Sequence, residues 1–341
     1  MQPFAFLTEQ GRARRMRPLA FAALEHYGFD VRRLRLVNNE TNCTFRVDTE
    51  DGQTFALRIS VPDIRTLAET RAEIAWLGAL ARESDIPVAR PIPTRTGEFI
   101  VEAGARGVPE PRRCVLFEWV RGRTVGERPT RPQLREFGRL IARLHSFGAS
   151  YRPPTPEAVR RMDQFFPLGG PDVLLNEDTR ALLSPQGYDR LREMRAAVER
   201  ELAWLYGRDE PPSILHGDFH WWNVMAYRDT LRPIDFEDLC WGYPIQDLAI
   251  SAYYTAPGEH EEVFRAEVRR GYEEIAPWPE LYPSQLDLHR VHRALDLFNF
   301  VLGSTYRHDQ QLMEHFLDRI QGHHWQVYET WKSKFDERFY A

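Results

Sequence analysis

Three oxygen-bearing side chains stand at the ends of short apolar runs in the middle of the chain. Ile214 and Leu215 lead into a His-Gly-Asp tripeptide that ends at Asp218, and Asn223 follows five residues later. A second apolar run leads into Asp235. Because a carboxylate at the end of a buried strand is costly unless it is paired or binds a metal, we expect Asp218, Asn223 and Asp235 to converge on one oxygen-lined site. Hard oxygen ligands of this kind suit Mg²⁺ better than zinc.

These aspartates allow two other interpretations. Aspartate is common in turns, and that interpretation stays open for Asp218 or Asp235 taken alone. The Asp-Phe-His tripeptide that begins at Asp218 suggests a metallophosphatase. That fold needs an Asn-His pair and further histidine ligands downstream, which the sequence does not offer at a sensible spacing, and His323-His324 is expected on the surface of a helical tail. The phosphatase is therefore rejected.

The elements that must position these residues begin with a strand-rich segment. Residues 1–100 are expected to hold strands and one helix, and Asp51-Gly52 supplies the positive φ that a tight hairpin turn requires. Apolar residues at helical spacing predict that helix from residue 66 to about residue 81. Strands are expected over 34–37, 43–48, 53–60, 98–103 and 114–120.

After Gly122 the pattern changes from strands to helices. A strand-rich first part and a helix-rich second part imply an α+β protein with two unequal lobes, which we place at residues 1–118 and 119–341. Helices are expected over 132–147, 191–206 and much of 245–341, and strands over 214–216, 223–227 and 231–236.

The motifs around the three oxygen-bearing residues resemble those of a known family. His216-Gly217-Asp218-Phe219-His220-Trp221-Trp222-Asn223, the later Ile-Asp-Phe-Glu-Asp over 234–238 and Asp-Leu-Ala over 247–249 resemble the catalytic core of the aminoglycoside phosphotransferase and choline kinase group. Within that group, these motifs are most similar to those of the branch of stress response kinase A and type II homoserine kinases. The resemblance implies a two-lobed, protein-kinase-like fold with a β-rich N-lobe and a mainly helical C-lobe.

This resemblance implies a role for each matching residue. Asp218 would accept the proton of the acceptor hydroxyl or orient that hydroxyl, and Asn223 would bind a metal ion. Asp235 would join Mg²⁺ to the β- and γ-phosphates of ATP. His216 and Asp247 match positions that brace the catalytic loop. His220 matches a recurrent family histidine, to which the sequence assigns no role.

Nucleotide-binding positions follow from the same resemblance. Arg58 occupies the strand position where kinases carry a phosphate-binding lysine, and we interpret it as a functional replacement, since arginine supplies 43 of the 45 basic residues. Glu73 matches the helix glutamate that pairs with this cation. The Glu118 carbonyl and the Val120 amide would face the adenine edge. The loop over 38–42 lies where kinases place a phosphate-covering hairpin, and it could equally be an ordinary turn.

Aromatic and acidic residues near the catalytic motif are candidates for binding the acceptor. Aromatic rings and carboxylates suit a polyhydroxylated or cationic molecule. For each residue the alternative is a plain core or solvated position. The candidates are Trp222, Glu237, Asp238, Trp241 and Asp296, with Phe219, Trp221 and Tyr243 as further lining.

Composition limits the classes of partner. The formal net charge of −5 argues against a nucleic-acid binder, and no apolar run approaches the roughly 18 residues that a membrane span needs. Three widely spaced cysteines and the lack of a signal-peptide pattern favour a cytoplasmic protein.

The sequence therefore predicts a Mg²⁺-dependent kinase that moves the γ-phosphoryl group of ATP to a hydroxyl of a small metabolite or amino sugar. A serine/threonine protein kinase of the stress response type is the first alternative. A catalytically silent ATP-binding scaffold is the second alternative, motivated by Arg58 and the glycine-free loop over 38–42. A protein–protein regulator whose kinase fold is incidental is the third.

Overall fold

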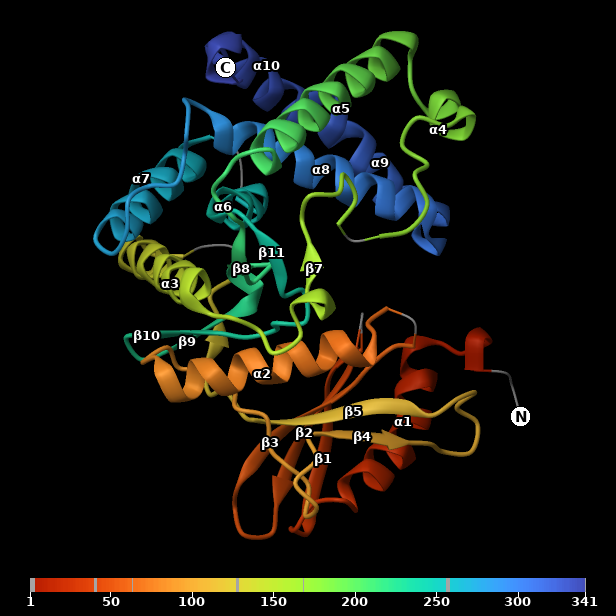
Figure 1. Ribbon diagram of the computed structural model, residues 1–341. Helices are drawn as coiled ribbons and strands as arrows, with labels where there is room; N and C mark the ends of the chain where they lie inside the picture. The colour runs from red at the N-terminus through yellow and green to blue at the C-terminus, as the bar shows by residue number, and fades with distance from the viewer. Residues whose placement is uncertain are drawn as a thin grey trace. The chain divides into compact units, whose positions relative to one another are not determined.

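Five short strands near the N-terminus form one antiparallel sheet in the computed structural model, which describes residues 4–39, 42–62, 64–126, 129–167, 169–255 and 258–340. Their order is β1-β2-β3-β5-β4 (Figure 1). The hairpin turn predicted at Asp51-Gly52 joins β2 to β3, and Gly52 has a φ of 84°. The strands are β1 (Val31–Asn39), β2 (Cys43–Thr49), β3 (Thr54–Ile59), β4 (Ile100–Ala103) and β5 (Arg112–Glu118).

Two helices pack against this sheet, where the sequence had predicted one in its first hundred residues. Helix α2 (Leu67–Glu83) matches the prediction, and Thr66 caps it. Helix α1 (Glu9–Leu24) was missed because Pro18 and a run of arginines obscure its apolar stripe. Leu57 and Ile59 join the core that α1 helps to form, whereas Arg58 between them reaches Glu73 of α2. Since neighbouring residues of a strand face opposite sides, the two helices cover opposite faces of the sheet.

The chain divides into two compact units, and no single residue position separates them, because each unit consists of three segments. Unit 1 comprises Met1–Gly122, Pro153–Ala158 and Arg232–Glu237, and unit 2 comprises the rest. Unit 1 therefore includes the residues that follow the expected boundary at 118 and two short segments from much later in the sequence. One of these later segments carries Asp235.

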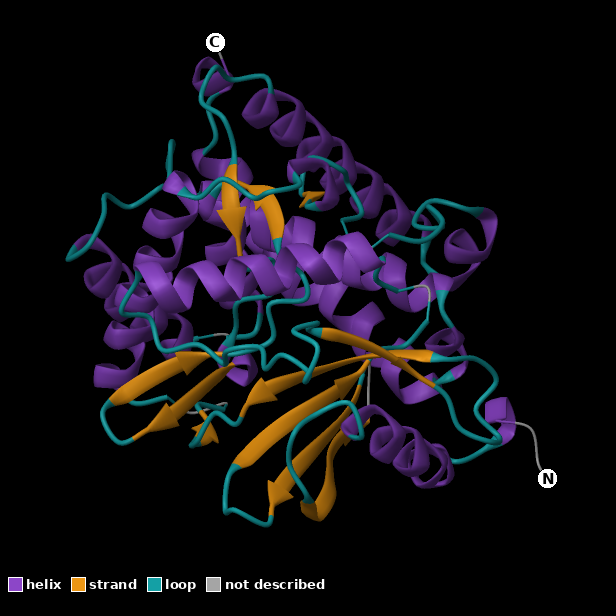
Figure 2. Cartoon of the chain, turned by 60° about the horizontal axis from the view of Figure 1, so that its bottom comes forward, coloured by secondary structure: helices purple, strands orange, loops and turns teal. Residues whose placement is uncertain are grey.

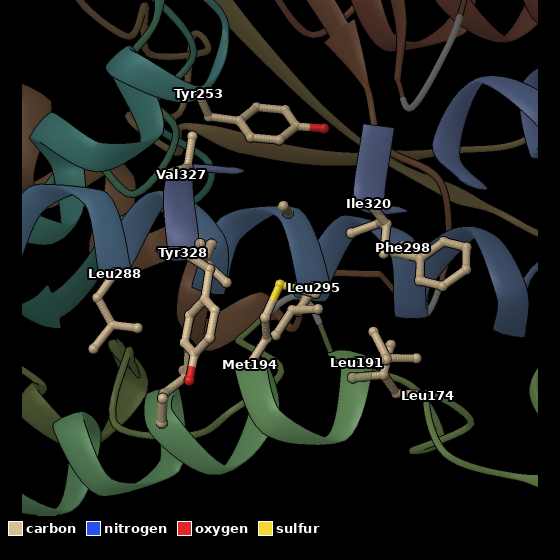
Figure 3. Close-up of a cluster of buried hydrophobic side chains, with 14 of the residues drawn as sticks. Leu174, Leu191, Met194, Tyr253, Leu288, Leu295, Phe298, Ile320, Val327 and Tyr328 are labelled. Carbon is tan, nitrogen blue, oxygen red and sulfur yellow. The ribbon is translucent and has the colours of Figure 1, made fainter. Parts of the chain in front are cut away.

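Unit 2 is mostly helical (Figure 2). Apolar side chains of α5, α8 and the C-terminal helices form one of its cores, in which Met194, Leu295 and Tyr328 lie close together (Figure 3). The predicted helices at 132–147 and 191–206 are confirmed as parts of α3 and α5. The helices are α3 (Arg131–Ser150), α4 (Glu177–Leu182), α5 (Pro185–Tyr206), α6 (Pro244–Tyr253), α7 (Glu259–Glu273), α8 (Gln285–Gly303), α9 (Gln310–Arg319) and α10 (Trp325–Lys334).

Two small sheets frame the segment that holds the catalytic motif. One has the order β10-β9-β6 and the other the order β7-β11-β8. The strand predicted over 231–236 ends early, at Pro233, because Asp235 has a left-handed backbone with a φ of 66°. The strands are β6 (Arg123–Thr124), β7 (Arg160–Arg161), β8 (Ser213–Leu215), β9 (Val224–Tyr227), β10 (Thr230–Pro233) and β11 (Cys240–Gly242).

The C-terminal residues of unit 2 are tied to a buried carboxylate. Glu201 of α5 accepts hydrogen bonds from the Tyr282 and Tyr340 hydroxyls, each at 2.6 Å, and from Gln285 Nε2 at 2.8 Å. The prediction that His323-His324 lies on the surface is wrong for His324. That ring is buried and stacks on Tyr253, with the ring centroids 5.2 Å apart.

Two general expectations can be compared with the structure. No helix in the described part of the chain is long and apolar enough to cross a membrane. The three cysteines, Cys43, Cys114 and Cys240, are buried free thiols.

Gly148 allows α3 to approach β8, and this contact can be tested. A Cβ atom at Gly148 would lie 2.0 Å from the Ile214 carbonyl oxygen, which is backbone and cannot turn aside. Alanine favours a helix over glycine by about 1 kcal/mol, but overpacking of this kind costs about 1–3 kcal/mol. We therefore expect Gly148→Ala to lower the free energy of unfolding measured in urea. Gly104→Ala is the control, since a Cβ there meets nothing within 4 Å. Equal stability of the two variants would contradict this packing.

Candidate active site

Asp218 lies in the turn between β8 and β9, and both of its carboxylate oxygens accept hydrogen bonds from neighbouring side chains. Arg293 Nη2 donates to Oδ1 at 2.6 Å. His220 Nε2 lies 3.1 Å and Asn223 Nδ2 lies 3.2 Å from Oδ2. Burial alone would raise the pKa of Asp218, but the Arg293 charge and the contact with His220 outweigh it and lower the pKa well below its usual range. The carboxylate is therefore ionised and fixed in orientation.

The backbone of this turn depends on Gly217. Its φ is 82°, and a Cβ atom there would lie 2.0 Å from the Asp238 carbonyl oxygen. Farther along, the Ser251 hydroxyl donates to the Phe219 carbonyl at 2.6 Å. The turn is thus pinned against β11 and α6, and no side chain fits at residue 217.

Asp247 fixes the start of the same turn through two backbone amides. Its Oδ2 accepts from the His216 amide at 3.0 Å, and its Oδ1 accepts from the Gly217 amide at 2.9 Å. The His216 ring is buried and its Nδ1 accepts the Asp218 amide at 3.4 Å. Asp247 is fully buried in α6, so its charge is stabilised by donors rather than by water.

A second layer of buried groups supports Asp247. His145 of α3 places Nε2 3.4 Å from Asp247 Oδ2, and its Nδ1 lies 3.0 Å from the Tyr272 hydroxyl. Burial and the nearby Asp247 charge raise the pKa of Tyr272, so the phenol stays protonated. Since a carboxylate can only accept, Nε2 is the ring nitrogen that is placed to donate toward Asp247.

Arg293 is the contact of Asp218 that sequence reasoning missed. It lies on α8, 75 residues after Asp218, and is only 7% exposed. In a chain that uses arginine at nearly every basic position, nothing distinguishes it from its neighbours in the sequence. Only the periodicity of α8, which places Arg293 one turn from the candidate Asp296, hinted at a shared face.

The two metal-ligand candidates belong to different units. Asn223 in unit 2 donates through Nδ2 to the Asp218 carbonyl at 2.9 Å, which leaves its amide oxygen as the atom suited to a hard cation. Asp235 in unit 1 has the left-handed backbone noted above, a costly conformation often found at functional sites. No group of three or more histidine, cysteine, aspartate or glutamate side chains gathers at a metal-binding distance among the described residues.

Arg58 and Glu73 form a buried ion pair in unit 1. Arg58 Nη1 donates to Glu73 Oε1 at 2.8 Å, and Nη2 contacts Oε2, so the pair is bidentate. Burial alone would lower the pKa of Arg58, but the Glu73 charge outweighs it and raises the pKa. In the loop over 38–42, Asn42 donates to Glu237 Oε2 at 2.6 Å, and Glu40 and Thr41 lie outside the described residues.

Glu118 is the last residue of β5 and leads into the segment that connects it to β6. The Glu118 amide donates to the Arg90 carbonyl at 2.9 Å, and the Glu118 side chain pairs with the Arg90 guanidinium. Val120 follows without regular secondary structure and is half-buried. The assignment of Glu118 and Val120 to adenine stays a prediction.

The residues predicted to bind the acceptor differ in their exposure and in their charged neighbours. Trp222 is 45% exposed beside the turn, and Asp296 is buried with Arg293 Nη1 3.8 Å from its Oδ2. Asp238 lies 3.9 Å from Arg160, and Trp241 is half-buried in β11. Glu237 lies in unit 1, 3.9 Å from Arg58, so it lies beside the predicted phosphate-binding cation.

Three other aromatic candidates are core residues, which is the alternative that the sequence left open for each of them. Phe219 and Trp221 pack on Phe137, with ring centroids 4.6 and 4.1 Å away, and both are buried. The Tyr243 hydroxyl donates to the Glu210 carbonyl at 2.6 Å and is also buried. Their aromatic character serves packing beneath the turn.

Comparison with known proteins places these features in a family. The model of the phosphotransferase enzyme family matches residues 33–284. A homoserine kinase of Rhodospirillum rubrum is 28% identical over 241 residues, which cover 65% of each protein. The chain spans 63% and 65% of the length of two curated relatives.

Solved structures agree with the fold. An amicoumacin kinase in complex with AMP-PNP and Ca²⁺ is 16% identical, with a TM-score of 0.73 over 92% of this chain and 96% of that one. A microcompartment-associated aminopropanol kinase is 21% identical, with a TM-score of 0.72 over 93% of this chain and 97% of that one. The predicted α+β, protein-kinase-like fold is confirmed.

The two amides that Asp247 accepts make its replacement testable. In Asp247→Asn the side-chain N–H₂ of the new asparagine would face one of the two backbone N–H groups. Two donors would then oppose each other, and a buried polar group would be left unsatisfied at a cost of about 1–3 kcal/mol. We expect the free energy of unfolding to fall by that amount and the amides of His216 and Gly217 to exchange faster with deuterium. Asp229→Asn, in an exposed turn, is the control. Indistinguishable results for the two variants would refute the bracing role of Asp247.

Proposed function

Since the chain belongs to the phosphotransferase enzyme family, we propose that it transfers the γ-phosphoryl group of ATP to a hydroxyl group of a small metabolite or amino sugar. The observation that carries this proposal is the Asp218 carboxylate, which is ionised and held by both of its oxygens in a turn fixed by Asp247. A group that must accept a hydrogen bond from a reacting hydroxyl needs that fixed orientation.

In the proposed reaction Asp218 accepts a hydrogen bond from the acceptor hydroxyl and directs its oxygen toward the γ-phosphorus. Phosphoryl transfer passes through a loose transition state, so positioning and charge stabilisation provide most of the catalysis. The lowered pKa of Asp218 keeps the carboxylate ready to accept that bond. His216 and Asp247 act on the backbone of the turn rather than on the substrate.

Asn223 and Asp235 are the residues that we assign to Mg²⁺. An amide oxygen and a carboxylate are hard oxygen donors, and Mg²⁺ commonly takes few protein ligands together with phosphate oxygens. The ion would neutralise the charge of the β- and γ-phosphates when bound. The fit rests on the Asn223 amide, whose nitrogen is already committed to Asp218, and on the unusual backbone of Asp235.

Arg58 is the residue that we assign to the ATP phosphates, with Glu73 as its support. Kinases use a lysine paired with a glutamate for this purpose. Arginine keeps the positive charge, and its planar group forms the bidentate pair with Glu73. ATP as the donor is supported by the fold neighbour that was solved with AMP-PNP.

The names of similar proteins support a small acceptor. They include a homoserine kinase, an aminopropanol kinase and a probable ketoamine kinase. In this chain, unit 2 offers the exposed Trp222 ring and the Asp238 carboxylate, which suit an acceptor with a cationic amino group.

The proposal can be tested with Mg·ATP and a panel of amino alcohols, amino sugars and other hydroxyl metabolites. Mass spectrometry should find one added phosphate on a small molecule. Asp218→Asn should lower that turnover roughly 10²–10⁴-fold and leave Mg·ATP affinity within a few-fold, because Asp218 acts on the acceptor. Phosphate found only on added protein would favour a protein kinase. ATP binding without any transfer would favour the silent scaffold.

Arg58 allows a separate test of the nucleotide assignment. Arg58→Ala should lower kcat/KM for ATP roughly 100-fold or more, because it removes a phosphate contact and leaves Glu73 buried without its cation. Arg58→Lys should stay within about tenfold of the wild type, since the charge is kept. Arg46→Ala, which breaks an ion pair with Asp48 in the same sheet, is the control. Near-native values for both Arg58 variants would remove Arg58 from the phosphate site.

A further inference from the structure

Arg293 approaches the proposed catalytic carboxylate from a part of the chain that the family motifs do not include. It lies on α8, and its Nη2 donates to Asp218 Oδ1 at 2.6 Å. Within the described part of the chain, the further contacts of that carboxylate come from His220 and Asn223 of the turn itself and reach Oδ2. Oδ1 therefore depends on Arg293 for the hydrogen bond that fixes it.

We propose that Arg293 is a positioning residue for phosphoryl transfer, which holds the Asp218 carboxylate in the orientation that accepts the acceptor hydroxyl. The inference rests on the proposed function, because it assigns Arg293 a part in that reaction. With Oδ1 held from α8 and Oδ2 held from the turn, the carboxylate cannot rotate about its Cβ–Cγ bond. Without the bond to Oδ1, only Oδ2 would be held, and the carboxylate could rotate.

The guanidinium of Arg293 is itself fixed. Its Nη2 also donates to the Tyr254 hydroxyl at 3.3 Å, and its Nη1 lies 3.8 Å from Asp296 Oδ2. The Tyr254 ring in turn packs on the His220 ring, with the centroids 4.2 Å apart. A cation between two carboxylates and buried to this degree loses little further freedom when the substrate binds, which is the condition for a preorganised site.

The charges around the carboxylate explain why an arginine is needed there. Asp218 faces His220 and His216 from the turn, Tyr254 from the end of α6 and Arg293 from α8. Of these side chains, Arg293 alone carries a permanent charge. A hydrogen bond from a charged donor to a carboxylate is shorter and stronger than one from a neutral donor, so it fixes Oδ1 more firmly. The planar guanidinium can serve Asp218 and Asp296 from separate nitrogens, which a lysine ammonium cannot match.

A purely structural role makes a different prediction. If Arg293 only balanced the buried Asp296 charge, its loss would reduce stability and leave turnover per folded molecule unchanged. A positioning role predicts a loss in kcat that depends on the presence of the Asp218 carboxylate. The two roles can therefore be separated by kinetics.

The experiment uses the full chain with an acceptor found in the panel above. Arg293→Met should lower kcat roughly 100-fold, the usual cost of a misplaced catalytic group, with KM for ATP within about threefold. Arg293→Lys should recover part of the loss, and guanidinium ion at low, non-denaturing concentration should partly restore Arg293→Met. Arg139→Met, which breaks an ion pair between Arg139 of α3 and Glu274 at the end of α7, should keep the wild-type kcat.

A double-mutant cycle completes the test. In an Asp218→Asn background, Arg293→Met should cause no further loss, because the group it orients is gone. Unchanged kcat in folded Arg293→Met, or a full additional loss in the Asp218→Asn background, would overturn the inference. If Arg293→Met does not fold, Arg293→Lys at wild-type kcat would overturn it equally. Failure of the wild-type chain to phosphorylate any panel member would instead refute the proposed function.

Discussion

The structure of the candidate site depends on one buried carboxylate, that of Asp247, which accepts two successive backbone amides at the start of the catalytic turn. A turn between short strands has few backbone bonds of its own, and here a fully buried anion replaces them. The anion is tolerable because every donor around it is fixed: two amides by the turn, and His145 by α3 and Tyr272. The geometry of Asp218 follows from this arrangement, since its backbone starts one residue after the second amide.

Local motifs in the sequence were enough to predict the turn that holds Asp218. They did not predict the contacts that this turn and Arg58 make with distant parts of the chain. The His-Gly-Asp run, the apolar strand before it and the later Asp247 lie within short stretches whose pattern indicates their roles. Arg293 and Glu237 could not be assigned in this way. Arg293 meets Asp218 only because α8 returns to the turn, and Glu237 approaches Arg58 only because a segment from late in the chain joins unit 1.

The misplaced expectations share a physical cause. Helix α1 was missed because exposed arginines dilute its apolar stripe, and His324 was placed on the surface because polar residues usually lie there. The aromatic residues Phe219 and Trp221 were assigned to the acceptor by their type, but they fill the space under the turn. In each case burial depended on a neighbour that is distant in the sequence, which periodicity within one segment does not report.

The division of the chain into units also constrains the order in which it can fold during synthesis. Unit 1 is not complete when its first 122 residues have left the ribosome, because it also contains Pro153–Ala158 and Arg232–Glu237. The Arg58–Glu73 pair can form early, but Glu237 reaches Arg58 and Asn42 only after residue 237 has been translated. Unit 2 waits longer still, since the Glu201 carboxylate receives its last hydroxyl from Tyr340. A nascent chain of this protein therefore carries an incomplete unit 1 until residue 237 has been translated, although all five strands of its sheet have been translated by residue 118. Chaperones have that interval in which to bind it.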